Sequence, residues 1–183
     1  MLHLPEEMPT LVDGDLTLRP WRVSDAPAVF EACQDPVIQE YTTVPVPYTR
    51  EHAEHFVASR AGDPAEAGLA FAMMHAGQLA GSMSLHHVQA FDHIAELGYW
   101  IAPAARGRGL ATRGARLVCG YGFGIGLRRI TALVLPENEA SRRTALAAGF
   151  ELETIHRAAM TRRDGSQSDA LVFAQFPPTV IDG

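Results

Sequence analysis

The chain has 183 residues, of which 47% are hydrophobic, and a formal net charge of −6. This length is sufficient for one domain with a substantial core, and no apolar run approaches the roughly 20 residues of a membrane-spanning helix. The acidic charge argues against a general nucleic-acid-binding protein. Residues Met1 to Glu7 lack the basic and apolar regions of a signal peptide, so a cytoplasmic location is expected.

The N-terminal third predicts one strand followed by two helices. Residues 11–19 alternate enough for a strand, and Ser24 is expected to cap the first helix. Pro36 ends that helix, because the residue before a proline is pushed out of the helical conformation. Thr49 is placed to cap a second helix over residues 50–59, after a loop that contains two prolines.

The remaining elements are predicted from apolar alternation and from the glycines and prolines that mark turns. Turns are expected at Gly62-Asp63-Pro64 and from Arg162 to Gly165, and Gly149 is placed to end a helix. The predicted strands are 69–75, 79–87, 94–101, 130–135, 151–159 and 170–176, and the predicted helices are about 109–124 and 140–148.

This order of elements predicts an α+β fold. Antiparallel strands come first, and a strand–helix–strand–helix–strand succession follows, which favours one mixed, largely antiparallel sheet with helices on both faces. The sequence shows no internal repeat or linker. A single domain over residues 1–183 is therefore expected, with a core of about 11–176 and terminal extensions 1–10 and 177–183.

The stretch Arg106-Gly107-Arg108-Gly109-Leu110-Ala111 joins a predicted strand to a predicted helix. Free N–H groups at a helix start, together with the helix dipole, hold phosphate groups, and glycines let a ligand approach the backbone. A P-loop is excluded because the chain contains no lysine, and a dinucleotide fingerprint fails because Thr112 stands at its third glycine position. The stretch therefore indicates either a site for a phosphate-bearing cofactor or a glycine-rich turn with solvated arginines.

Positive charge is concentrated in the same part of the sequence. Between Arg106 and Arg143 there are eight arginines and only two acidic residues, Glu137 and Glu139. These arginines are either solvated on helix faces or attract a polyanionic cofactor.

The cysteines and histidines give no metal-binding pattern. Cys33 and Cys119 are far apart and are expected as buried free thiols, although one disulfide is left open. The pairs His86-His87 and His52/His55 lack the additional cysteine or carboxylate ligands that a zinc site needs. No metal is therefore expected.

Several ordered motifs resemble the GNAT superfamily of acyl-CoA-dependent N-acetyltransferases, and within it the RimJ/RimL-type branch that acetylates protein N-termini and other amines. Arg106, Gly109 and Ala111 fit the phosphate-loop pattern Gln/Arg-x-x-Gly-x-Gly/Ala. Further motifs extend the resemblance over about residues 11–176: Leu16 to Pro20 with Asp25-Ala26, Glu96 to Ile101 with Pro103, Asn138 to Ser141 with Gly149-Phe150, and Gly165 with Asp169.

The resemblance implies that two neighbouring strands splay apart and that the acyl-CoA lies in the gap. Its pyrophosphate is expected on the backbone of the phosphate loop, its pantetheine arm beside Tyr99 and Ile101, and its thioester carbonyl at an N–H near Trp100 or Ile101. The implied cofactor residues are Tyr99, Trp100, Ile101, Arg106, Gly107, Arg108, Gly109, Leu110, Ala111, Thr112, Asn138 and Ser141.

Glu96 is the predicted general base, acting directly or through water. It is a charged residue in an apolar strand, so burial is expected to raise its pKa toward the working pH; the alternative is a strand-end glutamate that faces water or an arginine. Ser141 is expected near the leaving thiolate, with a plain helix cap as the alternative. The pocket for the acceptor is expected to include Tyr41, Tyr48, His86 and His93.

The leading hypothesis is an enzyme that transfers acetyl from acetyl-CoA to a primary amine, either a protein N-terminus or a small amine, by direct attack in a ternary complex. One alternative is a transferase for succinyl-CoA or another acyl-CoA. Others are a non-catalytic CoA-binding module and a structural domain without cofactor. No nucleic-acid or membrane partner is expected, and a homodimer is left open because the branch often dimerises.

Overall fold

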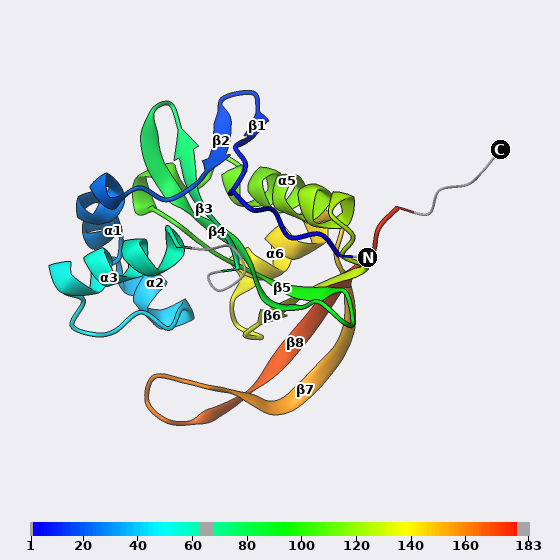
Figure 1. Cartoon of the computed structure of the whole chain (residues 1–183). Helices are drawn as coiled ribbons and strands as arrows, with labels where there is room; N and C mark the ends of the chain where they lie inside the picture. The colour runs from blue at the N-terminus through cyan, green and yellow to red at the C-terminus, as the bar shows by residue number, and fades with distance from the viewer. Residues whose placement is uncertain (1, 63–67, 179–183) are drawn as a thin grey trace.

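The computed structural model describes residues 2–62 and 68–178, and its centre is one eight-stranded sheet (Figure 1). The strand order is β1-β2-β3-β4-β5-β6-β8-β7, and every neighbouring pair is antiparallel except β5 and β6. The strands are β1 Leu11–Asp13, β2 Leu16–Arg19, β3 Leu69–His75, β4 Gln78–Gln89, β5 Ile94–Ile101, β6 Arg129–Val134, β7 Glu151–Thr161 and β8 Gln167–Gln175. The predicted mixed, largely antiparallel sheet is confirmed.

Helices lie on both sides of this sheet (Figure 1). Helices α1 and α3 pack together, and α5 packs on α6 and on the central strands. The helices are α1 Ala26–Ala32, α2 Pro36–Tyr41, α3 Arg50–Arg60, α5 Leu110–Gly124 and α6 Glu139–Ala148. In the described part of the chain, none of them has the length and apolar character needed to cross a membrane.

Two glycines let α5 lie close to the sheet. A Cβ on Gly114 would come within 2.6 Å of the Met73 side chain, and one on Gly122 within 2.7 Å of the Leu85 side chain. Both of these partners are fully buried. The glycines in this helix therefore allow tight packing rather than simply weakening the helix, and they fix α5 against β3 and β4.

The structure corrects three predictions near the N-terminus. Residues 11–19 form a hairpin rather than one strand, because Gly14 turns the chain with a φ of +57°. Ser24 does not cap α1: a short 3-10 turn precedes the helix, and Asp25 serves as its N-cap residue. Helix α2 was not predicted, and the side chain of Asp35 caps it by accepting a hydrogen bond from the Ile38 N–H at 2.9 Å.

Other local predictions are confirmed. Thr49 caps α3, and Gly149 ends α6 with a φ of +100°. Cys33 and Cys119 are buried free thiols. The turn predicted at Gly62-Asp63-Pro64 lies partly outside the described residues, as does the C-terminal extension beyond residue 178.

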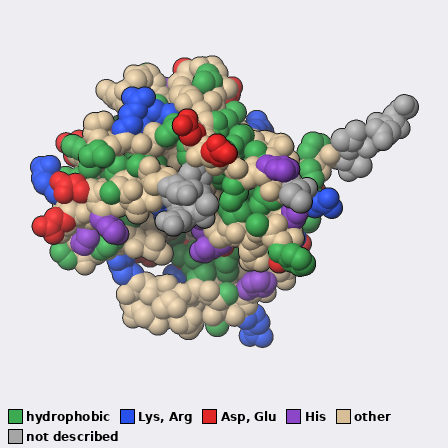
Figure 2. All heavy atoms as spheres, in the orientation of Figure 1, with side chains coloured by type: hydrophobic (Ala, Val, Ile, Leu, Met, Phe, Trp, Pro, Cys, Tyr) green, Lys and Arg blue, Asp and Glu red, His purple; other side chains and the backbone are tan. Residues whose placement is uncertain are grey.

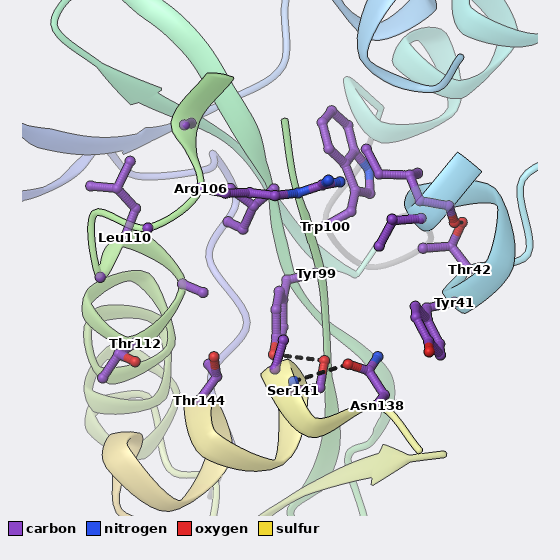
Figure 3. A pocket seen from close by; sticks show the side chains of 18 residues that line it. Tyr41, Thr42, Tyr99, Trp100, Arg106, Leu110, Thr112, Asn138, Ser141 and Thr144 are labelled. Atoms are coloured by element: carbon purple, nitrogen blue, oxygen red, sulfur yellow. Dashed lines mark hydrogen bonds between the residues drawn. The ribbon is translucent and has the colours of Figure 1, made fainter. Parts of the chain in front are cut away.

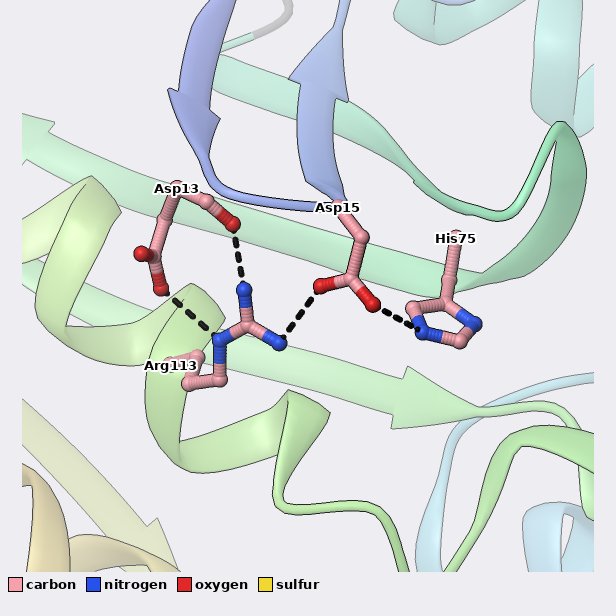
Figure 4. Close-up of polar contacts among 4 residues, drawn as sticks. All are labelled: Asp13, Asp15, His75 and Arg113. Carbon is pink, nitrogen blue, oxygen red and sulfur yellow. Dashed lines mark hydrogen bonds and ion pairs between the residues drawn. The ribbon is translucent and has the colours of Figure 1, made fainter.

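An arginine on α5 ties the β1–β2 hairpin to the helix (Figure 4). Arg113 donates to Asp13 Oδ2 at 2.8 Å and to Asp15 Oδ1 at 2.9 Å. His75 on β3 contacts the other Asp15 oxygen at 2.9 Å. The first turns of α5 are therefore anchored to the edge of the sheet.

Candidate active site

The sheet opens between β5 and β6. The two strands pair only from Ile94 to Glu96, opposite Arg129 to Thr131, whereas β5 continues to Ile101. The N–H of Ala102 donates to Ala80 on β4 at 2.8 Å, so alternate residues of β5, Trp100 among them, direct their backbone groups toward β4. By the same alternation, the backbone groups of Tyr99 and Ile101 face the gap.

A cavity of about 280 Å³ occupies this gap (Figure 3). Its walls come from α2, the C-terminal half of β5, the loop before α5, and the start of α6. The lining residues are Val37, Ile38, Tyr41, Thr42, Tyr99, Trp100, Ile101, Ala105, Arg106, Gly107, Gly109, Leu110, Ala111, Thr112, Asn138, Ala140, Ser141 and Thr144. Most residues implied as cofactor contacts therefore lie around one cavity.

The N-terminus of α5 forms one end of this cavity. Gly107 and Gly109 have φ angles of +74° and +69°, and a Cβ on either would meet nothing within 4 Å. The first carbonyl to accept within the helix is that of Gly109, from the Arg113 N–H. Among the described residues, none accepts a hydrogen bond from the N–H groups of Leu110 to Thr112. These donors and the positive end of the helix dipole make an anion site.

The Arg106 side chain holds the loop in place by reaching α2. Its guanidinium donates to both oxygens of Asp35, at 2.5 and 3.3 Å. This pairing holds the pKa of Asp35 below its ordinary value. Because the guanidinium is engaged with Asp35, the backbone of the loop is the part best placed to meet an anion.

Ser141 lies where the first cavity meets a second one. Tyr99 Oη donates to Ser141 Oγ at 3.1 Å, and Asn138 Oδ1 accepts from the Ser141 N–H at 3.0 Å. Asn138 is therefore the N-cap of α6, and the Ser141 hydroxyl is not needed for capping. The alternative of a plain helix cap at Ser141 is wrong.

The second cavity has a volume of about 1100 Å³ and lies between strands β4 to β6 on one side and α3 with the segment after α2 on the other. The hollow beside the hairpin is visible in Figure 2, with histidine side chains on the same face. The two cavities share the lining residues Tyr41, Thr42, Tyr99, Trp100, Asn138 and Ser141. A molecule in one cavity can therefore contact a molecule in the other.

One face of β4 supplies a polar wall to the second cavity. Ser82, Ser84 and His86 line it, whereas the intervening Met83 and Leu85 are fully buried in the core. Polar and apolar residues therefore alternate along β4, as expected of a strand with one apolar face. Sequence reasoning missed Ser82 and Ser84, although the alternating pattern from residue 82 to residue 86 was available to find them.

Glu96 lies on the same wall, between two histidines. Its Oε1 is 3.4 Å from His86 Nε2, and its Oε2 is 3.5 Å from His87 Nδ1. The contact with His86 is the largest cause that lowers the pKa of Glu96; burial opposes it, and His87 adds to the lowering. The expectation of a raised pKa is therefore wrong, because the strand bulge brings two imidazoles to the carboxylate. The expectation that no carboxylate lies beside His86 and His87 is wrong for the same reason.

Gly98 makes room for the His86 ring. A Cβ at this position would lie 2.6 Å from His86 Cε1 and 3.0 Å from its Nδ1. Any larger residue would push the imidazole away from Glu96, two positions earlier on the same face of β5. The glycine in the sequence Glu-Leu-Gly-Tyr therefore sets the position of the histidine.

The other predicted acceptor-site residues divide into two groups. Tyr41 and Tyr48 line the second cavity, and Tyr48 is almost fully buried. His93 lines neither cavity. Its Nδ1 contacts the Gly126 carbonyl at 2.8 Å, because residue 93 precedes β5 and lies at the opposite end of that strand from the gap.

The β7–β8 hairpin contributes Met160 to the second cavity and contacts the segment after α2. The predicted turn is confirmed, since the Gly165 N–H donates to the Arg162 carbonyl at 2.9 Å. Arg163 at its tip donates to the carbonyls of Gln39, Thr42 and Val44, between 2.6 and 3.3 Å. Sequence reasoning assigned this tract only to a turn, because no local pattern shows a contact with residues 120 positions earlier.

Comparisons with known proteins agree with this architecture. Residues 15–151 match the family described as acetyltransferase (GNAT) domain. YoaA of Bacillus subtilis (strain 168), named an uncharacterized N-acetyltransferase, is 35% identical over 102 residues, which cover 55% of this chain and 57% of YoaA. YnaD of the same strain, similarly named, is 30% identical over 139 residues, covering 75% of this chain and 80% of YnaD.

Solved structures show the same fold. The microcin C7 self-immunity acetyltransferase MccE, in complex with acetyl-CoA and AMP, has a TM-score of 0.83 and 19% identity over 90% of this chain and 94% of its own. RimL, a ribosomal L7/L12 α-N-protein acetyltransferase in complex with coenzyme A, has a TM-score of 0.82 and 22% identity over 92% and 97%. With the family match over most of its length, the chain belongs to the GNAT acetyltransferase family.

Proposed function

We propose that the chain is an acyl-CoA-dependent N-acyltransferase that moves an acetyl group from acetyl-CoA to a primary amine of a small molecule or a protein N-terminus. The observation that carries this proposal is the meeting of two cavities at Tyr99 and Ser141. One of them ends at the free N–H groups of α5, which suit a pyrophosphate. The other has a polar wall of Ser82, Ser84, His86 and Glu96, whose oxygen and nitrogen atoms can accept hydrogen bonds from an amine.

The donor would lie along the open edge of β5. The pyrophosphate would accept from the N–H groups between Gly107 and Thr112, and the Thr112 hydroxyl could add a bond. The pantetheine amides would pair with the backbone of Tyr99 and Ile101, which face the gap. Because the backbone of Trp100 is directed toward β4, Ile101 is the better oxyanion donor of the two residues considered.

In the reaction proposed, the amine nitrogen attacks the thioester carbonyl carbon, the carbon–sulfur bond breaks, and the thiolate leaves. Glu96, directly or through a water, would accept the proton that the amine loses. Ser141 Oγ accepts a hydrogen bond from Tyr99, so its own proton is free to be directed at the leaving sulfur. Burial raises the pKa of Cys33 to about 11 and that of Cys119 to about 12, so neither supplies a thiolate nucleophile, which favours direct attack.

A thiol-release assay with a panel of amines tests this function. With acetyl-CoA, release of free CoA should depend on the amine offered, and product analysis should find the acetyl group on its nitrogen. Release only with succinyl-CoA would assign the longer donor. Acyl-CoA binding without turnover of any amine, including peptides with free N-termini, would instead support a CoA-binding module.

A further inference from the structure

His86, His87 and Glu96 form a cluster on the wall of the second cavity that the proposed transfer reaction does not fully use. Each contributes one donor atom, and these three atoms lie within 4.8 Å of one another. Both histidines approach the same carboxylate, one on each of its oxygens. The cluster combines two imidazoles with one carboxylate, a ligand set that suits zinc better than the oxygen-seeking calcium and magnesium.

A β-bulge in β4 brings two consecutive histidines to the same carboxylate. In a regular strand, neighbouring side chains point to opposite faces, so His86 and His87 could not both meet Glu96. Here the β4–β5 register shifts between His86 and Gln89, which places two residues of β4 opposite one of β5. His87 also adopts a φ of +50°, a conformation that costs a non-glycine residue free energy.

Each histidine–carboxylate separation matches the distance between two ligand atoms on one zinc ion, although the two separations end on different oxygens of Glu96. With bonds of about 2.0–2.1 Å and tetrahedral angles, two ligand atoms on one zinc lie about 3.4 Å apart. The two histidine–carboxylate separations are 3.4 and 3.5 Å, longer than good hydrogen bonds. The His87 side chain is 74% exposed and can turn to shorten the remaining separation.

We propose that His86, His87 and Glu96 bind a zinc ion on the wall of the second cavity. Three protein ligands leave a fourth position, and the cluster lines the cavity, so that position is open to water or to the amine. Gly98 supports the site by leaving the space that the His86 ring occupies. Another contact between a histidine and a carboxylate, that of His75 with Asp15, is a poorer metal site. Arg113 also binds Asp15, and its guanidinium would repel a cation.

Zinc at this site would inhibit the transfer reaction. A Glu96 carboxylate bound to the cation is a much weaker base, so it no longer accepts a proton from the amine effectively. The ion also stands where the amine is expected to approach. Inhibition therefore rests on the proposed function, whereas zinc binding itself does not.

Calorimetric titration of Zn²⁺ into the chelator-treated full chain tests the site. His87→Asn removes one ligand with a residue that tolerates the left-handed conformation, and Glu96→Gln removes another. His93→Asn is the matched control, because His93 has a similar φ of +59° in the same hairpin but lies outside the cluster. Thermal unfolding without zinc checks that each variant is folded, and Mg²⁺ serves as the control cation.

The expected result is one zinc site in the wild type and in His93→Asn, weakened at least about 100-fold in His87→Asn and in Glu96→Gln. Zinc should also raise the melting temperature of the wild type and not that of these two variants. Equal zinc binding by all four proteins, or none by the wild type, would overturn the site. Zinc binding by a chain that binds no acyl-CoA would overturn the proposed function alone, and acyl transfer without zinc binding would overturn only the metal site.

Discussion

At the scale of single residues, Glu96 has the most distinctive surroundings in the candidate site. Its side chain is 27% exposed, lies beside His86 and His87, and faces the cavity proposed for the amine. Its carboxylate is the only acidic group lining either cavity in the described part of the chain. We propose that Glu96, or a water that it holds, accepts the proton, beside the histidines that line the same cavity.

Replacing this carboxylate tests that role. Glu96→Gln should lower kcat by about 100-fold or more, because general-base catalysis contributes factors of that size. The Kd for acetyl-CoA should not change, since the proposed donor contacts come from other residues. Steady-state kinetics and calorimetry measure the two quantities, with the exposed Glu151→Gln as control. An unchanged kcat would remove Glu96 from the mechanism.

Ser141 is the second residue whose role can be isolated. Ser141→Ala should reduce kcat by roughly tenfold, the value of one lost hydrogen bond of about 1.4 kcal/mol to the leaving sulfur. The melting temperature should stay close to that of the wild type, because Asn138 caps α6. A lower melting temperature with normal kcat would leave Ser141 with a structural role only.

Sequence reasoning predicted roles for these two residues but did not predict their surroundings. Glu96 stood out as a charge in an apolar strand, and Ser141 came from a resemblance near a predicted helix start. The histidine contacts of Glu96 depend on a strand bulge, which is set by pairing with another strand. The Tyr99–Ser141 hydrogen bond joins β5 to α6, and no local pattern encodes such a long-range contact.

At the scale of elements, the β7–β8 hairpin contacts α2 and the segment after it, and this part of the chain forms a wall of the second cavity. Arg163 connects them: its Nη2 contacts the carbonyls of Gln39, Thr42 and Val44, and its Nε also donates to the Gln39 carbonyl. Tyr41 and Thr42 belong to this wall and to both cavities. The hairpin therefore positions residues that a bound amine would touch.

Arg163→Ala should loosen this wall. The KM for the amine should rise several-fold, with little change in the Kd for acetyl-CoA, whose proposed site is held by Arg106 and Asp35 instead. Arg163→Lys should not restore KM, because lysine has a single terminal nitrogen and lacks the Nε that also donates to the Gln39 carbonyl. Arg157→Ala, on the exposed face of β7, is the matched control. Equal KM values in all four proteins would contradict this role of the hairpin.

The connection between β2 and α1 depends on a buried ion pair. Asp25 accepts from Arg19 at 2.7 and 2.8 Å and from the Arg22 N–H at 2.8 Å. Burial alone would raise the pKa of Asp25, but these donors outweigh it and lower the pKa below its ordinary value. The pair therefore stabilises the fold above the unfolded pKa of about 4, and this stability is lost as pH falls through the folded pKa.

Asp25→Asn should therefore reduce stability at pH 7 by roughly 2 kcal/mol, the value of hydrogen bonds to a charged group. It should also flatten the loss of stability as the pH falls below about 4. Urea unfolding at a series of pH values measures both effects. Parallel curves for the wild type and the variant would show that Asp25 does not contribute to the acid dependence.

At the scale of the whole molecule, the sheet is divided by the opening between β5 and β6. Helix α5, with its N–H groups, packs on β4 and β5 of one part, and the other part consists of β6 and the β7–β8 hairpin. Arg106, Arg113 and Arg129 pair with carboxylates, so the positive charge of this region is partly neutralised. The N-terminus of α5 is the anion site that we propose for the cofactor.

The order of the central and C-terminal elements was predictable, because their apolar alternation and their glycines are local signals. The strands from 69 to 101 and the cap at Gly149 are examples. The β1–β2 hairpin and α2 were missed, since Gly14 and Asp35 act through a backbone angle and a side-chain cap rather than through hydrophobic pattern. The opening of the sheet came from the family resemblance, not from the residues.

The most direct test of the account is a calorimetric titration of acetyl-CoA into the wild type, Gly109→Asp and Gly165→Asp. Both glycines have a positive φ, and a Cβ on either would meet nothing within 4 Å, but only Gly109 lies at the start of α5. We predict micromolar binding to the wild type and to Gly165→Asp, and at least about 100-fold weaker binding to Gly109→Asp, because its carboxylate would face the pyrophosphate. No binding to the wild type, or equal binding to both variants, would contradict the placement of the cofactor at this helix.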